Sequence, residues 1–257
     1  LHYQPIIDAA SGRIAAAEAL VRWTDPTGRM RLPGEFIAVA EDSRIIVPLG
    51  AWVFNTACER AALWQRSGIR IRLAVNVSPR QFEHPDFVDM VARTLRTTGA
   101  EPTMLEIEIT EAAIMSNAEP VLATLKAIHG MGIRVAIDDF GTGYSSFAYL
   151  KRFAVDSLKI DRTFVEGIEH EDNFAIAQSI LSVAHTLGLP VTAEGIETPD
   201  QSNIMADLGC DRLQGYHYGR PMPVHEFEAL FASHAFVPES ATVAHPRTSS
   251  GDITRSR

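Results

Sequence analysis

The sequence has little cysteine, no excess of positive charge and no long apolar run. Cys58 and Cys210 are the only cysteines among 257 residues, too few for a disulfide framework or a cysteine-rich metal site, which indicates a reducing compartment. The formal charge of −9 argues against binding of a polymeric nucleic acid through a basic face. No apolar run reaches membrane-spanning length and no signal peptide is evident, so we expect a cytoplasmic protein.

Short apolar runs alternate with amphipathic stretches along most of the chain. We expect strands near 2–8, 13–20, 70–77, 103–109, 133–138, 155–160, 190–194 and 211–216, with helices between them at positions such as 51–66, 85–98, 118–130, 172–187 and 224–233. This rhythm predicts an α/β fold with a mainly parallel sheet, and eight strands in this length predict a closed TIM-like (β/α)8 barrel. Ser11-Gly12 lies between the first two strands and predicts a hairpin, hence one antiparallel strand.

Two regions are expected from composition. Residues 1–236 form the barrel domain, whereas residues 237–257 are polar and lack periodicity, which is typical of a disordered tail.

Polar residues recur near the ends of five predicted strands. Side chains alternate between the two faces of a strand, so each strand has one apolar face and one face that carries polar groups. The polar positions are Asn76, Glu108, Asp138, Lys159 and Glu194. Because barrel enzymes place their chemistry at the carboxyl ends of the strands, these side chains are expected to converge at one mouth.

Adjacent aspartates follow the apolar run RVAI, at Asp138 and Asp139. Burying unpaired carboxylates is costly, and bound cations are the simplest way to keep them ionised. The donors are oxygen-rich, with no clustered histidine or cysteine, which favours Mg²⁺ or Mn²⁺ over zinc. Two such ions form a clamp suited to displacement at phosphorus, with Lys159 placed to act on the attacking water or on developing charge.

Seven motifs stand in order along the chain: EALVRW (18–23), NVSPRQF (76–82), EITE (108–111), DDFGTGYSS (138–146), KIDRTFV (159–165), AEGIET (193–198) and QGYHYGRPMP (214–223). In this order the sequence resembles the EAL domain family of cyclic di-GMP phosphodiesterases. The resemblance covers roughly residues 1–235. It implies a TIM-like barrel with one antiparallel strand, and a metal-dependent hydrolysis of cyclic di-GMP to linear pGpG by in-line attack of a hydroxide that bridges two divalent cations.

The resemblance also implies roles for individual residues. Catalytic roles fall to Lys159, Glu18 and Glu194. The metal ligands are Glu18, Asn76, Glu108, Asp138, Asp139 and Glu194, with Asp138 shared between the two ions. Glu111 tethers the loop after the aspartates, and Gln214 supports the site by hydrogen bonding. Substrate contacts are expected from Arg22, Leu20, Gln4, Asp161, Gln214 and Pro221.

The resemblance extends to partners. It implies a homodimer whose interface is joined to the metal site by the loop after the aspartates. The chain opens inside an expected strand, so an upstream sensor or cyclase-like domain, or a membrane anchor, is expected in a longer protein. Arg44 stands where the family usually has glycine, and Gly219 where it usually has serine or alanine.

Simpler roles compete with these assignments. An aspartate pair after a strand is often a cap or turn, and Glu111 has the position of an acid favoured by a helix dipole. Arg22 has Asp25 within reach in the sequence as an ion-pair partner, and Ser78 is expected to cap a helix. The three tryptophans are expected in the core. They are Trp23, Trp52 and Trp64.

Two other functions remain open from sequence. One is an inactive receptor of the same fold that binds cyclic di-GMP and signals to a partner. The other is an unrelated metal-dependent barrel enzyme, such as one that acts on an enolisable sugar acid.

Overall fold

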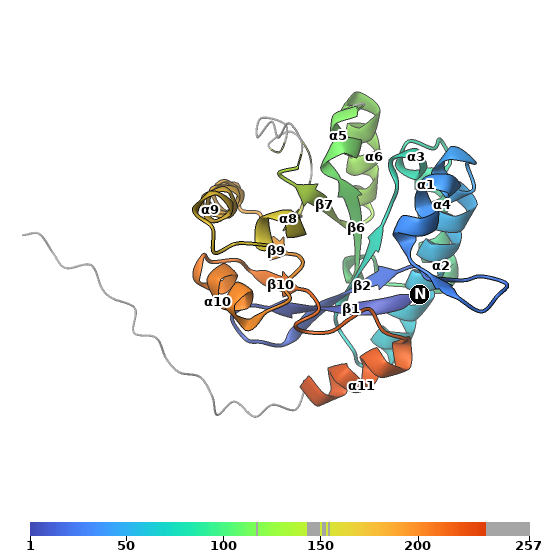
Figure 1. Cartoon of the computed structure of the whole chain (residues 1–257). Helices are drawn as coiled ribbons and strands as arrows, with labels where there is room; N and C mark the ends of the chain where they lie inside the picture. Colours follow the sequence, from blue (N-terminus) through green and yellow to red (C-terminus); the bar gives the residue numbers. More distant parts are fainter. Residues whose placement is uncertain (117, 143–149, 151–152, 154, 235–257) are drawn as a thin grey trace, which may run out of the picture.

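The computed structural model describes residues 1–116, 118–142, 150, 153 and 155–234. Eight strands close into a barrel in the order β1-β10-β9-β8-β7-β6-β5-β2 (Figure 1), which confirms the expected architecture. The strands are β1 (His2–Asp8), β2 (Ile14–Leu20), β5 (Arg72–Asn76), β6 (Leu105–Thr110), β7 (Arg134–Phe140), β8 (Ser157–Ile160), β9 (Val191–Ala193) and β10 (Arg212–Gln214). The expected tail at 237–257 and part of the loop after the aspartates lie outside the described residues.

The expected antiparallel strand is β1. It pairs antiparallel with both β2 and β10, whereas the other neighbouring strands of the barrel pair in parallel. The turn from β1 to β2 places Gly12 at φ +68°, a conformation that glycine adopts without steric cost. Asp8 Oδ1 accepts a hydrogen bond from Ser11 N at 2.8 Å and fixes the start of this turn.

Helices surround the barrel, and a small hairpin projects from it (Figure 1). The helices are α1 (Pro33–Asp42), α2 (Ile46–Arg66), α3 (Pro79–Phe82), α4 (Phe87–Thr98), α5 (Glu111–Ser116), α6 (Ala118–Gly130), α8 (Arg162–Val165), α9 (Glu171–Thr186), α10 (Pro199–Asp207) and α11 (Val224–His234), with a 3-10 turn at Pro102–Met104. The hairpin pairs β3 (Trp23–Thr24) with β4 (Met30–Arg31). None of the helices among the described residues is both long enough and apolar enough to span a bilayer.

The core lies between the outer face of the barrel and the helices. Alternate residues of each strand, such as Leu73 and Val75 on β5, are buried there with the apolar faces of the helices. Trp64 is 2% exposed and stacks on Phe227 with ring centroids 5.3 Å apart. The expectation for the other two tryptophans was wrong, because Trp23 on the hairpin is 47% exposed and Trp52 on α2 is 50% exposed.

Arg44 joins α1 to α2 in a strained conformation, with φ +62°. A left-handed conformation costs a residue with a Cβ about 1–2 kcal/mol, while glycine adds about 0.5–1 kcal/mol of unfolded-state entropy. We therefore expect Arg44→Gly to raise the free energy of unfolding by about 0.5–1 kcal/mol, measured by urea denaturation. Arg44→Ala is the control, because it removes the guanidinium and keeps the strain. A gain in the alanine variant equal to that in the glycine variant contradicts this account.

Candidate metal centre and active site

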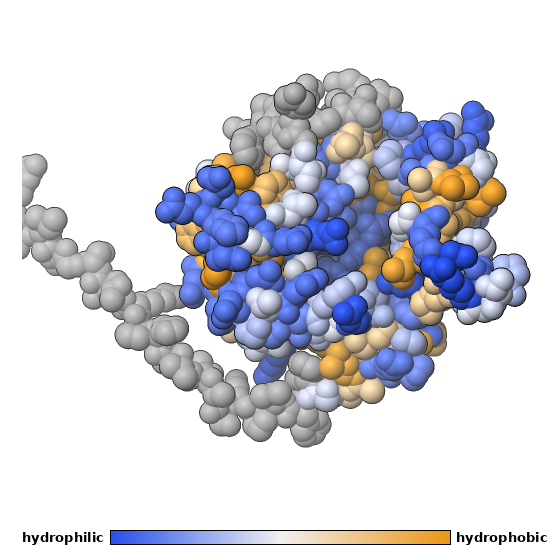
Figure 2. Space-filling model, viewed as in Figure 1, coloured by the Kyte–Doolittle hydropathy of each residue, from blue (hydrophilic) through white to orange (hydrophobic). Residues whose placement is uncertain are grey.

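The barrel interior carries a buried ammonium surrounded by carboxylates. Lys159 on β8 is 2% exposed, and its Nζ lies 2.5 Å from Glu194 Oε1, 2.9 Å from Glu108 Oε2, 3.5 Å from Asp138 Oδ1 and 3.7 Å from Glu18 Oε2. These acids come from β2, β6, β7 and the end of β9. Figure 2 shows this face hollowed near its centre, with hydrophilic residues around much of the hollow.

The charges of this cluster hold one another in place. Burial lowers the pKa of Lys159, but the four surrounding carboxylates outweigh burial and raise that pKa well above its usual value. Burial raises the pKa of Glu18, yet the Lys159 charge and the hydrogen bonds from Gln214 and Asn76 bring it below its usual value. The ammonium and Glu18 are therefore both charged at neutral pH.

A chain of amides positions Glu18. Asn76 Nδ2 at the end of β5 donates to Glu18 Oε1 at 2.5 Å, and Gln214 Nε2 on β10 donates to Glu18 Oε2 at 2.5 Å. Gln214 Nε2 also donates to Gln4 Oε1 at 3.2 Å, and Gln4 Nε2 donates to Gly219 O at 3.0 Å. Next to Asn76, Ser78 caps α3 as expected, since its side chain accepts from Gln81 N at 3.3 Å.

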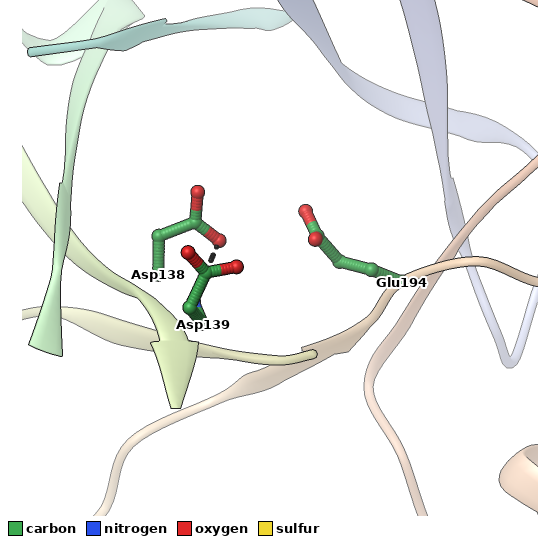
Figure 3. A group of neighbouring side chains, drawn as sticks. All are labelled: Asp138, Asp139 and Glu194. Atoms are coloured by element: carbon green, nitrogen blue, oxygen red, sulfur yellow. Dashed lines mark hydrogen bonds between the residues drawn. The ribbon is translucent and has the colours of Figure 1, made fainter. Parts of the chain in front are cut away.

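A β-bulge presents both aspartates at the mouth. Ile137 pairs with Leu158 and Phe140 with Ile160, so three steps along β7 match two steps along β8. Asp139 has φ +53°, and its N–H donates to Asp138 Oδ1 at 3.0 Å. In Figure 3 the side chains of Asp138 and Asp139 lie together and face Glu194 across the opening. Strict alternation sends neighbouring side chains to opposite faces, and the bulge cancels that alternation at the aspartates.

Glu111 anchors the segment that follows the aspartates. It is 2% exposed, and its Oε2 accepts a hydrogen bond from Gly141 N at 3.0 Å. Gly141 has φ +99°, and a Cβ there would lie 2.9 Å from the Phe164 ring. The backbone therefore passes between the Glu111 carboxylate and a packed aromatic side chain, where only glycine fits without a shift.

The residues present fit hard divalent cations. Both oxygens of Glu108 are buried, and neither accepts a hydrogen bond of acceptable geometry from the described residues, although Oε2 lies close to Lys159. Asp138, Asp139 and Glu194 each offer a carboxylate oxygen within 4.8 Å of the others. Carboxylate and amide oxygens in this number are the ligands that Mg²⁺ and Mn²⁺ prefer.

Three acids of this cluster have raised pKa values in the metal-free protein, although the Lys159 ammonium lies nearby. Burial raises the pKa of Glu108 well above its usual range, with Lys159 opposing and the neighbouring carboxylates reinforcing. Burial, together with Asp138 and Glu18, raises the pKa of Glu194 to about 8. Burial and the charges of Asp138 and Asp161 raise the pKa of Asp139 to about 6. A cation that binds here must therefore displace protons.

An outer pocket of about 260 Å³ adjoins the cluster. Of the expected substrate-binding residues, Gln4, Leu20 and Gln214 line it; Arg22, Asp161 and Pro221 do not. The Asp161 side chain caps α8 by accepting from Thr163 N at 3.0 Å, and Pro221 O lies 3.2 Å from His2 Nδ1. Sequence reasoning did not assign five lining residues to the site, although all lie inside the recognised motifs: Arg162, Gly195, Glu197, Gly215 and Tyr216.

Arg22 remains available to an anion. Its Nη1 donates to Val21 O at 2.8 Å, and no carboxylate of the described residues lies within ion-pair distance of it. Asp25 is bound instead by Arg31, with Nε 2.9 Å from Oδ2. The Asp25 ion pair considered for Arg22 was therefore wrong.

The fold and this site define a class: TIM-like barrels with an oxygen-rich acidic cluster at the carboxyl mouth. The family model described as EAL domain matches residues 1–221, and the chain belongs to the EAL domain family. It is 42% identical over 234 residues to MucR of Pseudomonas aeruginosa, named a bifunctional diguanylate cyclase/cyclic di-GMP phosphodiesterase, covering 90% of this chain and 34% of that protein. It is 36% identical over 232 residues to the cyclic di-GMP phosphodiesterase PdeR of Escherichia coli, covering 90% of this chain and 35% of that protein.

The fold likeness to solved structures is close. The MucR phosphodiesterase in its c-di-GMP complex matches with a TM-score of 0.86 and 42% identity, covering 88% of this chain and 93% of that chain. The chain spans between 27% and 35% of the length of eight of the curated relatives it matches.

Metal binding should release protons. Because the Glu194 carboxyl has a pKa of about 8 in the metal-free protein, it is mostly protonated at pH 6, and we expect Mn²⁺ affinity to rise as pH increases toward 8. The gain is about tenfold per pH unit for each proton displaced. Calorimetric titration at several pH values, in buffers of different ionisation enthalpy, counts the protons. Glu194→Gln should release fewer protons than wild type; unchanged proton release would contradict this assignment.

Removing the central ammonium should destabilise the metal-free protein. Lys159→Met leaves buried carboxylates without their cation, at a cost of about 3–5 kcal/mol in the free energy of unfolding at pH 8. The loss should shrink at pH 5, where the carboxylates protonate, and Mn²⁺ should restore part of it. Lys126→Met, at an exposed position of α6, is the matched control. Equal denaturation midpoints for the two variants would refute the role given to Lys159.

Proposed function

We propose that this domain hydrolyses cyclic di-GMP to linear pGpG with the help of two divalent cations, Mg²⁺ or Mn²⁺. Relatives over most of the chain carry names of cyclic di-GMP phosphodiesterases, and the similar MucR structure is a c-di-GMP complex. The arrangement of acids at the barrel mouth supports the same reaction from this chain's own residues.

Charge balance in the mouth carries the proposal. Glu18, Glu108, Asp138 and Glu194 lie within 4.0 Å of the Lys159 ammonium, Asp139 lies beside them, and no other cation of the described residues forms an ion pair with these five acids. Fully ionised, they leave an excess of four negative charges, which two divalent cations neutralise. The same excess repels a substrate with two phosphates when the cations are missing. Cations are therefore needed both for substrate binding and for turnover.

The ligands divide into two sets that share one residue. Glu18, Asn76, Glu108 and Asp138 would hold the first cation, while Asp138, Asp139 and Glu194 would hold the second. The β-bulge makes this sharing possible because it turns both aspartates toward the mouth. When bound, the cations supply charge neutralisation at the phosphate and lower the pKa of the attacking water.

Chain groups position the reactants. Lys159 orients the attacking water and offsets charge that develops on the phosphate oxygens. Arg22 has no carboxylate partner among the described residues and binds a substrate phosphate as a bidentate donor. Gln4, Leu20 and Gln214 line the pocket next to the cluster, where they contact the nucleoside. Asp161, whose carboxylate interacts with that of Asp139, and Pro221 are weaker candidate contacts, since neither lines this pocket.

Glu111 keeps the aspartates in register. Its hydrogen bond to Gly141 N fixes the backbone just after Asp139, so it stabilises the loop on which the second cation depends. The homodimer and the upstream sensor or cyclase-like domain stay predictions.

Cyclic di-GMP incubated with the domain should yield pGpG only when Mn²⁺ or Mg²⁺ is present, as followed by chromatography. Glu18→Gln removes a charged ligand while keeping the side-chain shape, and we expect activity to fall by at least about 100-fold. Glu59→Gln, at an exposed position of α2, should retain wild-type activity. Tight binding of cyclic di-GMP without cleavage in the presence of Mn²⁺ would instead identify an inactive receptor, and equal turnover by Glu18→Gln would refute the ligand set.

A further inference from the structure

Three arginines begin strands at the amino end of the barrel, opposite the acidic mouth. Arg72 is the first residue of β5, Arg134 of β7 and Arg212 of β10. Each lies two or four residues before a polar residue that belongs to the mouth, so the alternation of side chains places it on the inward face of its strand. The chain carries a formal charge of −9, yet positive charge gathers at this end of the barrel interior.

The guanidinium of Arg72 has a donor without an acceptor. Its Nη1 lies 3.3 Å from Oε2 of the buried Glu106. The Nε–H is also buried, and it forms no hydrogen bond with the described residues. A buried donor left without an acceptor costs about 1–3 kcal/mol. Glu106 therefore satisfies only part of this guanidinium, and a further acceptor would stabilise it.

The other two arginines have no acid of their own. Neither Arg134 nor Arg212 forms an ion pair with a carboxylate of the described residues. Burial lowers the pKa of Arg72 and Glu106 opposes that change, while the charges of Arg134 and Arg212 lower the pKa further. Because β7 and β10 flank β5 on opposite sides in the order of the barrel, the three positive charges meet across the interior.

Two more acids near this end are already held by main-chain groups. Asp156 Oδ2 accepts a hydrogen bond from Val135 N at 2.9 Å, and Asp8 Oδ1 accepts one from Ser11 N at 2.8 Å. These bonds fix one carboxylate at the start of a strand and the other in a turn. The positive charge of the arginines is therefore only partly offset.

A buried hydroxyl lies on the same inward face of the barrel. Ser157 begins β8 and is 2% exposed, and its Oγ forms no hydrogen bond with the described residues. It precedes Lys159 by two residues, so its side chain also points into the interior, on the amino side of the ammonium. Guanidinium groups and hydroxyls are donors that recognise the oxygens of a phosphate group.

We propose that a phosphate group, either free or carried by a nucleotide, binds at the amino end of the barrel among the three inward arginines and the Ser157 hydroxyl. This site goes beyond the hydrolysis proposed above and requires neither the divalent cations nor the cyclic dinucleotide. The metal-free mouth carries negative charge and repels phosphate, so the metal-free protein isolates binding at the amino end.

The binding test uses the full chain in EDTA, titrated with inorganic phosphate and separately with adenosine 5′-monophosphate at constant ionic strength. NMR of the arginine Nε–H groups follows the titration, and we expect a saturable shift at Arg72. Arg134→Gln/Arg212→Gln, which leaves the ion pair of Arg72 intact, should weaken binding at least tenfold, and Ser157→Ala at least threefold. Arg80→Gln is the control, because Arg80 is exposed on α3, which follows the carboxyl end of β5.

A saturable shift with inorganic phosphate identifies the free ion as the ligand, and a shift with the nucleotide alone identifies a nucleotide phosphate. The absence of a shift with either one overturns the site. An equal shift with chloride also overturns it, because the effect is then charge screening.

Equal phosphate affinity in the Arg134→Gln/Arg212→Gln and Arg80→Gln proteins overturns the site as well, and unchanged affinity in Ser157→Ala refutes the part given to the hydroxyl. Failure to hydrolyse cyclic di-GMP leaves the phosphate result intact, so the two proposals fail separately.

Discussion

The buried ammonium of Lys159 is the interaction on which the mouth of this barrel depends. Four carboxylates lie within 3.7 Å of its Nζ, and none of them is neutralised by another cation among the described residues. Buried acids in such a position either protonate or acquire a counterion. The raised pKa values of Glu108 and Glu194 show that one ammonium is insufficient for all of them. The fold therefore holds an excess of negative charge in place, and additional cations can neutralise it.

Nearer the opposite end of the barrel, a buried acid on one of the same strands does have its own cationic partner. Glu106 and Glu108 lie two residues apart on β6 and share its inward face. Glu106 lies nearer the amino end of β6. It forms a structural ion pair with Arg72, whose Nη1 lies 3.3 Å from Glu106 Oε2. Glu108 has no arginine partner among the described residues, and it shares the Lys159 ammonium with three other acids. The two acids on β6 therefore differ in their partners, because Glu106 pairs with an arginine and Glu108 with a shared lysine.

Much of this arrangement was predictable from the sequence, because it depends on the alternation of side chains along strands and on the β-α repeat along the chain. Alternation along the predicted strands assigned Glu108 and Lys159 to the inner face, and the Ser11-Gly12 turn predicted one antiparallel strand, which the structure identifies as β1. The bulge at Asp138 and Asp139 was not predictable, since it depends on pairing with β8 and not on β7 alone. Trp23 and Trp52 were misassigned for a related reason: side-chain hydrophobicity does not say whether a partner surface exists. The lining role of Arg162 also arises from tertiary packing, because α8 presses against Gly195, where a Cβ would lie 2.4 Å from the Arg162 side chain.

Two pockets meet at the carboxyl end of the barrel: the outer pocket beside the acidic cluster, and an apolar pocket of about 390 Å³ bounded by α1, α2 and the ends of β2 and β5. At the carboxyl end, inward-facing residues of the strands open into the mouth, so their polar side chains meet there. Outward-facing residues at the same height, such as Ala19 and Val77, are covered by helices, and where α1 and α2 leave a gap the exposed wall is aliphatic. Leu20 at the end of β2 stands between these two environments and borders both. Glu18, two residues earlier on the same strand, belongs to the acidic cluster, so the end of this one strand contributes residues to both environments.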